Sequence, residues 1–316
     1  MKFLFTILAF FLFAVEVSAQ DKMLVKRIYV FDVTKSMIGE GKINGKYGTP
    51  KVFSQLKDDL VSTITGSSIC DDDEIVIIPF TNTTFDKIMG YGRDRNRIAD
   101  EVKNLTTKSG DTNIVDAWLA GLKEIDQNKI NLLFLMTDGI HNCGPDVNEL
   151  YRSLEQWDDN ANNLAFYFML TKNAESDKID SIAKNKPTME IVHSSNIKIN
   201  ILQLSSNYKV NVKGNNKYEG IINARSGSCN PTELKHVTMQ MVDTTNYYIA
   251  DSQIFTDKII LTLSTHKDKN SLPISSQNTI TFTWNDNKGD NTKTYIMPKT
   301  ITLQIDNLDT RTMKIY

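Results

Sequence analysis

The stretch IYVFDVTKS, residues 28–36, decides the fold. Its first four residues, Ile28 to Phe31, form a continuous apolar run, which is typical of a strand buried on both faces of a parallel sheet. Asp32, Thr34 and Ser36 follow at alternate positions, so a carboxylate and two hydroxyls come directly after this strand. Ligands of open parallel sheets bind at the carboxyl ends of the strands. The stretch therefore predicts a buried strand that ends in a polar site.

Outward from this stretch, residues 24–195 alternate between apolar runs and helical patterns. Strands are expected where apolar residues run together, and helices where they recur every three or four positions. The expected strands are 28–31, 74–80, 130–136, 164–170 and 189–192, with 83–89 as a hairpin arm, and the expected helices are 51–65, 93–105, 112–125, 147–157 and 176–183. This alternation predicts an α/β fold with a Rossmann-like, doubly wound, mostly parallel sheet.

From residue 197 to residue 316 the helical patterns stop and short strand-like runs follow one another. The expected strands are 199–204, 208–212, 236–242, 259–263, 279–284 and 300–305. Their spacing predicts an all-β, immunoglobulin-like sandwich of roughly seven antiparallel strands. The chain is thus expected to have two domains, 24–195 and 197–316.

The first residues have the pattern of a secretory signal peptide. A positively charged start is followed by the apolar run 3–15, and Val17-Ser18-Ala19 supplies small residues for cleavage. Residues 1–19 are therefore the expected signal peptide, and the protein is expected to be exported to a periplasmic or extracellular location. No second long apolar stretch follows, so no integral membrane segment is expected after cleavage.

The composition is that of a globular protein, with 40% hydrophobic and 23% charged residues. The formal net charge of −2 does not point to nucleic acid as a partner. The three cysteines allow at most one intramolecular bridge. Cys70 precedes an expected strand and Cys143 follows one, so they should lie at opposite edges of the sheet, and a bridge from Cys70 to Cys229 is the more plausible.

Two further loops bring oxygen ligands to the same edge of the sheet. Thr137-Asp138 follows the most apolar strand, and Thr112 lies just before a predicted helix. The candidate metal ligands are Asp32, Thr34, Ser36, Thr112 and Asp138. All five offer oxygen, which hard cations such as Mg²⁺ prefer.

These three segments resemble the metal-ion-dependent adhesion site of von Willebrand factor A domains. The matching residues are Asp32-x-Thr34-x-Ser36, then Gly110-Asp111-Thr112-Asn113, then Leu135-Met136-Thr137-Asp138-Gly139, in the order and spacing of that family. The resemblance covers residues 24–195. Two positions depart from the family's pattern: Thr34 replaces the commoner serine but keeps the hydroxyl, and Asp111 replaces a frequent glycine.

The resemblance implies a division of roles in the site. Thr34 and Ser36 would bind the metal directly, Thr112 would do so in one conformational state, and Asp32 and Asp138 would act mostly through waters. The remaining coordination position would take a carboxylate from a protein partner. The expected cofactor is Mg²⁺, with Mn²⁺ and Ca²⁺ as alternatives, and the expected function is non-catalytic cell adhesion or protein binding.

Four lysines lie in or beside the loop that leaves the first strand: Lys35, Lys42, Lys46 and Lys51. They would steer an acidic partner toward the metal, or they serve only solubility. The segment 37–50 is longer than a minimal connection, so it shapes the rim of the site or is a tolerated insertion.

Two alternative functions remain open. A structural component of an envelope assembly would bind its partners without metal. A metal-dependent phosphoester hydrolase would need a base, for which His141 is the candidate, but Thr34 stands where aspartyl phosphatases have a second aspartate. The chain has no GxSxG, HExxH or P-loop motif, so we expect no enzymatic activity.

Overall fold

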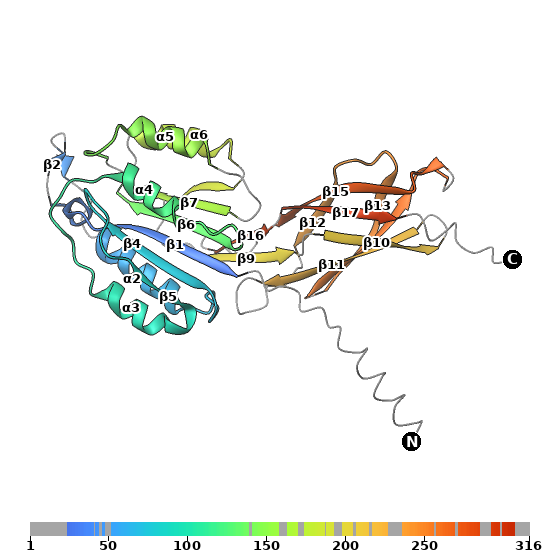
Figure 1. Cartoon of the computed structure of the whole chain (residues 1–316), viewed down its shortest axis with the longest axis horizontal. Coiled ribbons are helices and arrows are strands. Elements are labelled where there is room, and N and C mark those ends of the chain that lie inside the picture. Colours follow the sequence, from blue (N-terminus) through green and yellow to red (C-terminus); the bar gives the residue numbers. More distant parts are fainter. Residues whose placement is uncertain are drawn as a thin grey trace, which may run out of the picture.

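Figure 1 shows a computed structural model of the chain. It describes residues 24–40, 42–43, 46–47, 52–138, 141–157, 163–169, 174–186, 188–192, 198–204, 207–214, 217–226, 236–255, 257–268, 271–284, 292–297 and 299–306. The expected signal peptide lies outside them. Within the described residues, no helix has both the length and the apolar character needed to cross a membrane.

The first part of the chain builds an α/β sheet whose described strands have the order β5-β4-β1-β6-β7-β8. These strands are β1 (Val25–Asp32), β4 (Glu74–Phe80), β5 (Ile88–Tyr91), β6 (Ile130–Thr137), β7 (Asn163–Met169) and β8 (Met189–Val192). All neighbours pair in parallel except β5, which is antiparallel to β4. The predicted mostly parallel, doubly wound sheet is confirmed, and its strand order reverses between β1 and β6.

Helices cover both faces of this sheet because each has one apolar stripe to bury. The helices are α2 (Val52–Thr65), α3 (Arg95–Lys103), α4 (Ile114–Leu122), α5 (Val147–Glu155) and α6 (Ala174–Ala183). Helices α2 and α3 bury their stripes in one core, and α4, α5 and α6 bury theirs in the core of the other face. Short 3-10 helices η1 (Lys35–Ile38) and η2 (Gly92–Asp94) and the two-stranded hairpin of β2 (Lys42–Ile43) and β3 (Lys46–Tyr47) lie in the connections.

The second part of the chain is an all-β sandwich, as predicted. Its described strands are β9 (Lys198–Leu204), β10 (Asn207–Gly214), β11 (Lys217–Ser226), β12 (Val237–Met241), β13 (Tyr247–Ile254), β14 (Lys258–Thr265), β15 (Ser275–Trp284), β16 (Thr292–Met297) and β17 (Thr300–Asp306). Two pairings are parallel, β10 with β17 and β9 with β16, whereas we expected antiparallel strands throughout. Strands β11, β13 and β16 were not predicted.

Strand β16 connects the two parts of the molecule. It pairs with β9 of the sandwich, yet Met297 is buried in the α2–α3 core of the α/β sheet. The hydroxyl of Tyr295 donates a hydrogen bond to the carboxylate of Glu190 in β8, and burial raises the pKa of this hydroxyl. Figure 1 shows β9 and β16 between the α/β sheet and the rest of the sandwich. The division into domains at residues 195–197 stays a prediction. Strand β16 lies after this boundary in the chain, yet Met297 contributes to the first core.

A row of aromatic rings crosses the sheet and ends at this strand. Tyr29 stacks on Phe134 at 4.6 Å, Phe134 stacks on Phe166 at 5.1 Å, and Phe166 meets Tyr295 edge-on at 5.3 Å between ring centroids. The first three are in register across β1, β6 and β7. Each such pair contributes about 0.5–1.5 kcal/mol beyond the area that it buries. The row therefore stabilises the packing of β16 against the sheet that carries the candidate site.

The states of the two described cysteines agree with the predicted disulfide pairing. Cys70 is disulfide-bonded and Cys143 is a free thiol, which confirms that these two do not pair. Cys229 lies outside the described residues, so its bridge to Cys70 stays a prediction.

We expect a mass map of the unreduced, alkylated protein to contain a Cys70 peptide linked to a Cys229 peptide. Cys143 should carry the alkylating group, because its thiol is free and only half-buried. The same map after reduction should show all three cysteines alkylated. Three alkylated cysteines without reduction, or a linked peptide that contains Cys143, would contradict this connectivity.

Candidate metal centre

The loop after β1 holds its polar side chains by hydrogen bonds among themselves. One oxygen of Asp32, Oδ1, accepts from the backbone N–H of Thr34 at 2.9 Å, and Oδ2 accepts from the hydroxyl of Thr137 at 2.7 Å. The hydroxyls of Thr34 and Ser36 are 2.7 Å apart. All of these residues are buried. The alternate spacing in the sequence thus places one carboxylate and two hydroxyls in a single compact loop.

The second carboxylate belongs to the neighbouring strand. Phe31 in β1 is in register with Met136 in β6, so Asp32 ends one strand close to the Thr137-Asp138 end of the other. Asp32 and Asp138 are both 0% exposed. Burial, and next the negative charge of Asp138, raise the pKa of Asp32 from its ordinary 3.8 to about 7. Two buried carboxylates that repel each other create a demand for positive charge.

Thr112 lies on the third loop, which the ends of β1 and β4 support. The N–H of Lys108 donates to the carbonyl of Val33 at 2.7 Å, and the N–H of Asn113 donates to the carbonyl of Thr81 at 2.9 Å. Gly110 has a φ of +152°, and a Cβ there would lie 3.2 Å from Oγ1 of Thr81, so this position favours glycine. The loop therefore runs from the β1 loop to the start of α4, with Thr112 buried in it.

Helix α4 begins directly after Thr112. The side chain of Asn113 caps it by accepting from the N–H of Asp116 at 3.1 Å. Thr112 therefore directly precedes a capped helix start, at the same edge of the sheet as the loops after β1 and β6.

The donors at this edge fit a hard divalent cation. Two carboxylates and three hydroxyls supply only oxygen, which Mg²⁺, Mn²⁺ and Ca²⁺ accept. Among the described residues, no group of three or more histidine, cysteine, aspartate or glutamate side chains is placed to hold a metal. A metal here would therefore depend on hydroxyl ligands as much as on carboxylates.

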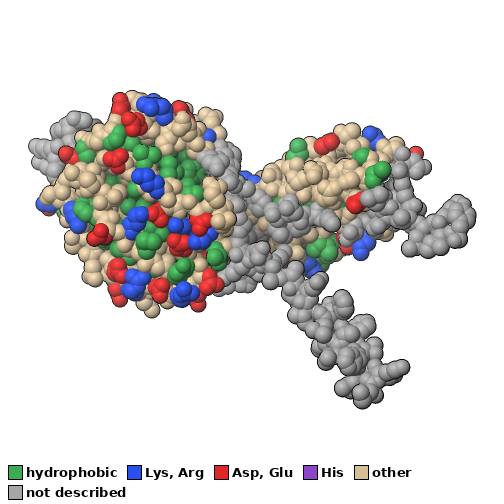
Figure 2. All heavy atoms as spheres, viewed as in Figure 1, with side chains coloured by type: hydrophobic (Ala, Val, Ile, Leu, Met, Phe, Trp, Pro, Cys, Tyr) green, Lys and Arg blue, Asp and Glu red, His purple; other side chains and the backbone are tan. Residues whose placement is uncertain are grey.

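The lysines expected to steer a partner have different surroundings. Lys35 is half-exposed and forms an ion pair with Glu40 at 3.3 Å, which offsets its charge locally. Lys42 and Lys46 lie in the β2–β3 hairpin, and Lys51 lies outside the described residues. Figure 2 shows basic and acidic side chains interspersed over the visible face of the α/β part.

The sequence did not single out the loop that follows Asp138 as a support of the site, except for His141 as a possible base. In the structure, Nδ1 of His141 accepts from the N–H of Ile114 at 3.2 Å, and Nε2 donates to the carbonyl of Pro145 at 2.8 Å. Both ring nitrogens are thus engaged, and the ring supports the start of α4. Its neighbour Asn142 contacts Thr112 directly.

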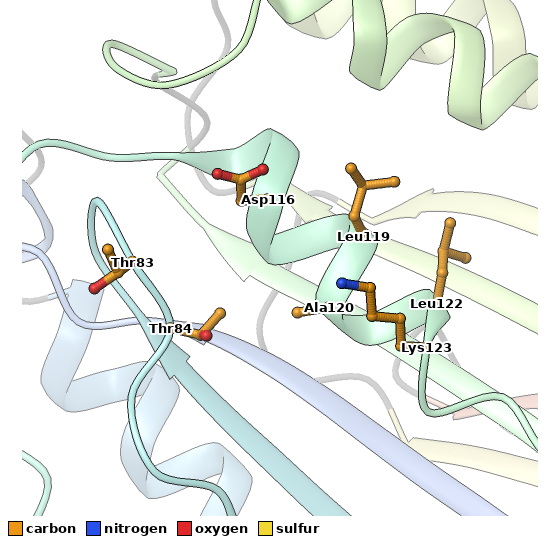
Figure 3. A pocket seen from close by; sticks show the side chains of 7 residues that line it. All are labelled: Thr83, Thr84, Asp116, Leu119, Ala120, Leu122 and Lys123. Carbon is orange, nitrogen blue, oxygen red and sulfur yellow. The ribbon is translucent and has the colours of Figure 1, made fainter.

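A groove of about 530 Å³ lies beside α4, one turn beyond Thr112. It is lined by the outer side of α4 and by the loop after β4: Thr83, Thr84, Asp116, Leu119, Ala120, Leu122 and Lys123. Figure 3 shows Asp116 and Lys123 toward opposite ends of the helix, with the two threonines across from it. The groove adds half-buried apolar surface next to the candidate metal centre.

Replacing Asp138 with asparagine should stabilise the metal-free protein. At pH 8 the two wild-type carboxylates repel, so Asp138→Asn should melt at a higher temperature than the wild type in EDTA. The pKa of Asp32 is higher in the folded protein than in the unfolded chain, so the folded protein binds the proton more tightly. This stabilisation is fully present below pH 4 and is lost as the pH rises toward 7, where Asp32 ionises in the folded protein. The advantage of Asp138→Asn should therefore be smaller at pH 5.5 than at pH 8.

Thermal melts at both pH values, with EDTA or with Mg²⁺, test this expectation. Mg²⁺ should raise the melting temperature of the wild type and leave that of Asp138→Asn unchanged. An Asp138→Asn variant that is less stable than the wild type in EDTA at pH 8 would show that the two carboxylates do not strain the fold.

No family model and no curated protein matches the sequence. Solved structures do resemble it, and they include von Willebrand factor A domains. The PilB minor pilin from Streptococcus sanguinis has 14% identity and a TM-score of 0.43, over 56% of this chain and 58% of the pilin. A von Willebrand factor type A protein from Catenulispora acidiphila has 12% identity and a TM-score of 0.41, over 90% of this chain and 66% of that one.

A third structure is proximal thread matrix protein 1 from the mussel byssus with a zinc-occupied MIDAS motif. It has 13% identity and a TM-score of 0.38, over 55% of this chain. This chain spans only 44% of the byssus protein's length. Likenesses at such identities and TM-scores do not carry a function from one protein to another.

Proposed function

We propose that this protein is an exported, non-catalytic adhesion module that captures an acidic group of a protein partner through one divalent metal. The metal would be Mg²⁺, with Mn²⁺ and Ca²⁺ as alternatives. The residues that would hold it are Asp32, Thr34, Ser36, Thr112 and Asp138. The protein would work in the periplasm or outside the cell, after removal of residues 1–19.

The observation that carries the proposal is that buried hydroxyls and buried carboxylates lie together at one edge of the sheet. Thr34 and Ser36 present two oxygens 2.7 Å apart, and Asp32 is held beside them by the hydroxyl of Thr137. Asp138 lies close enough to Asp32 for its charge to act on it. Burying a charged group is costly unless an opposite charge compensates it, and a divalent cation would compensate both carboxylates together.

The chemistry of the donors also favours an acidic partner. A bound Mg²⁺ supplies an electrophilic centre of octahedral geometry that usually keeps several waters. If neutral hydroxyls bind the metal directly and the carboxylates act through water, the metal keeps most of its charge. A carboxylate from a partner would then replace a water and gain the full attraction.

The two alternatives differ from this proposal in what they require. A phosphoester hydrolase needs a free base near the metal, and His141 already uses both ring nitrogens to support the start of α4. A structural component with metal-independent binding would leave the buried carboxylate pair without a role. Neither alternative is favoured by a feature of the described residues.

The proposal is tested first on the metal alone. Asp32→Asn keeps an oxygen to accept from Thr34 but loses the charge, so it should fold and fail to bind Mg²⁺ in calorimetric titration. Wild-type protein at a free Mg²⁺ concentration of about 100 times Kd should gain about 2.7 kcal/mol of stability. Asp100→Asn removes an exposed carboxylate on α3 and should behave like the wild type.

The partner is tested by capture from an envelope extract of the source organism. Proteins retained in Mg²⁺ should elute with EDTA, should not bind Asp32→Asn, and should be lost after the carboxyl groups of the extract are amidated. Proteins that stay bound in EDTA and that also bind Asp32→Asn would support the metal-independent alternative instead. Hydrolysis of a phosphoester that requires Asp138 would support the hydrolase.

A further inference from the structure

The backbone around Thr112 is held by the loop that follows Asp138. The N–H of Thr112 donates to the side-chain oxygen of Asn142 at 2.5 Å, and the N–H of Asn142 donates back to the carbonyl of Thr112 at 3.0 Å. One residue thus holds both polar groups of the Thr112 backbone. Thr112 is buried, whereas Asn142 is exposed.

The neighbouring amide groups are also accounted for. The N–H of Asn113 donates to the carbonyl of Thr81, and the N–H of Ile114 donates to the ring of His141. Three consecutive amides at the start of α4 therefore have acceptors, and two of the three acceptors come from residues 141–142. Helix starts leave such amides without partners inside the helix, so side chains from elsewhere can fix their position.

The packing beside Asn142 leaves little freedom for this loop. Gly144 has a φ of +87°, and a Cβ there would lie 2.3 Å from Nδ2 of Asn113. The amide group of Asn113 also donates to the carboxylate of Asp116 at 2.7 Å. The loop therefore packs closely against the start of α4, and Thr112 cannot shift without moving it.

We propose that Asn142 is a positioning residue of the metal centre, which sets metal affinity by holding the hydroxyl of Thr112 in place relative to Asp138. The inference rests on the proposed function, since it concerns the same metal. Asn142 acts through the Thr112 backbone and does not bind the metal. Residues that orient metal ligands in this way typically change metal affinity 10- to 100-fold when they are replaced.

The test measures Mg²⁺ affinity by calorimetry on the full mature chain. Asn142→Leu has a similar size but no acceptor for the N–H of Thr112, so its Kd for Mg²⁺ should rise by about 10- to 100-fold. Asn142→Asp keeps an acceptor oxygen and should bind Mg²⁺ at least as tightly as the wild type. An Asn142→Asp variant as weak as Asn142→Leu would overturn the proposal.

A matched control separates positioning from general stability. Asn131 lies at the other end of β6, buried, and its amide group donates to the carbonyls of Asp126 and Lys129 and to Asn163. Asn131→Ser should lower the melting temperature in EDTA and leave the Kd for Mg²⁺ unchanged. If Asn131→Ser weakens Mg²⁺ binding as much as Asn142→Leu does, the effect is general destabilisation and the proposal is wrong.

The two proposals fail in different ways in this experiment. A wild type that binds no Mg²⁺ would overturn the proposed function. A wild type that binds Mg²⁺ and an Asn142→Leu variant with the same Kd would overturn only the role of Asn142. Amide exchange gives a second readout: Mg²⁺ should slow exchange at Thr112 in the wild type and much less so in Asn142→Leu.

Discussion

The parallel pairing of β1 with β6 is the constraint on which the site depends. The strand order reverses between these two strands: after β1 the chain adds β4 and β5 on one side, and after β6 it adds β7 and β8 on the other. Ligands of open parallel sheets bind outside the carboxyl ends of the strands at such a point. Their register brings Asp32 and Asp138 into one buried space, where each carboxylate disfavours the charge of the other. Strands β1 and β6 are buried along their whole length, so packing in the two cores fixes the positions of both carboxylates.

The hydrogen-bond partners of Asp32 are neutral groups. Asp32 accepts from a hydroxyl and a backbone amide, and Lys35 in the loop after β1 forms an ion pair with Glu40. Neutral donors orient a carboxylate without cancelling its charge. A bound cation would supply the positive charge that these neutral donors lack, so an arrangement that raises the pKa of Asp32 in the metal-free chain would suit metal binding.

Sequence reasoning reached the strands of the α/β sheet because strands buried on both faces are continuous apolar runs. Apolar and polar residues are mixed along β11 and β13, and the apolar residues of β16 come only at its end, so the signals of these strands were weak. The five candidate ligands were found because each follows a strand or precedes a helix. Asn142 could not be found, because its hydrogen bonds with Thr112 depend on how two distant loops pack.

Strand β16 shows why the two parts of the chain are not independent. Met297 fills space in the core under β1, β6 and β7, and Tyr295 closes the aromatic row that begins with Tyr29. A fragment ending near residue 195 would expose Phe166 and leave Glu190 without the Tyr295 hydroxyl. Since β16 also pairs with β9, movement of the sandwich relative to the sheet would break either this pairing or the aromatic contact. These contacts link the sandwich to the sheet that carries the candidate metal site.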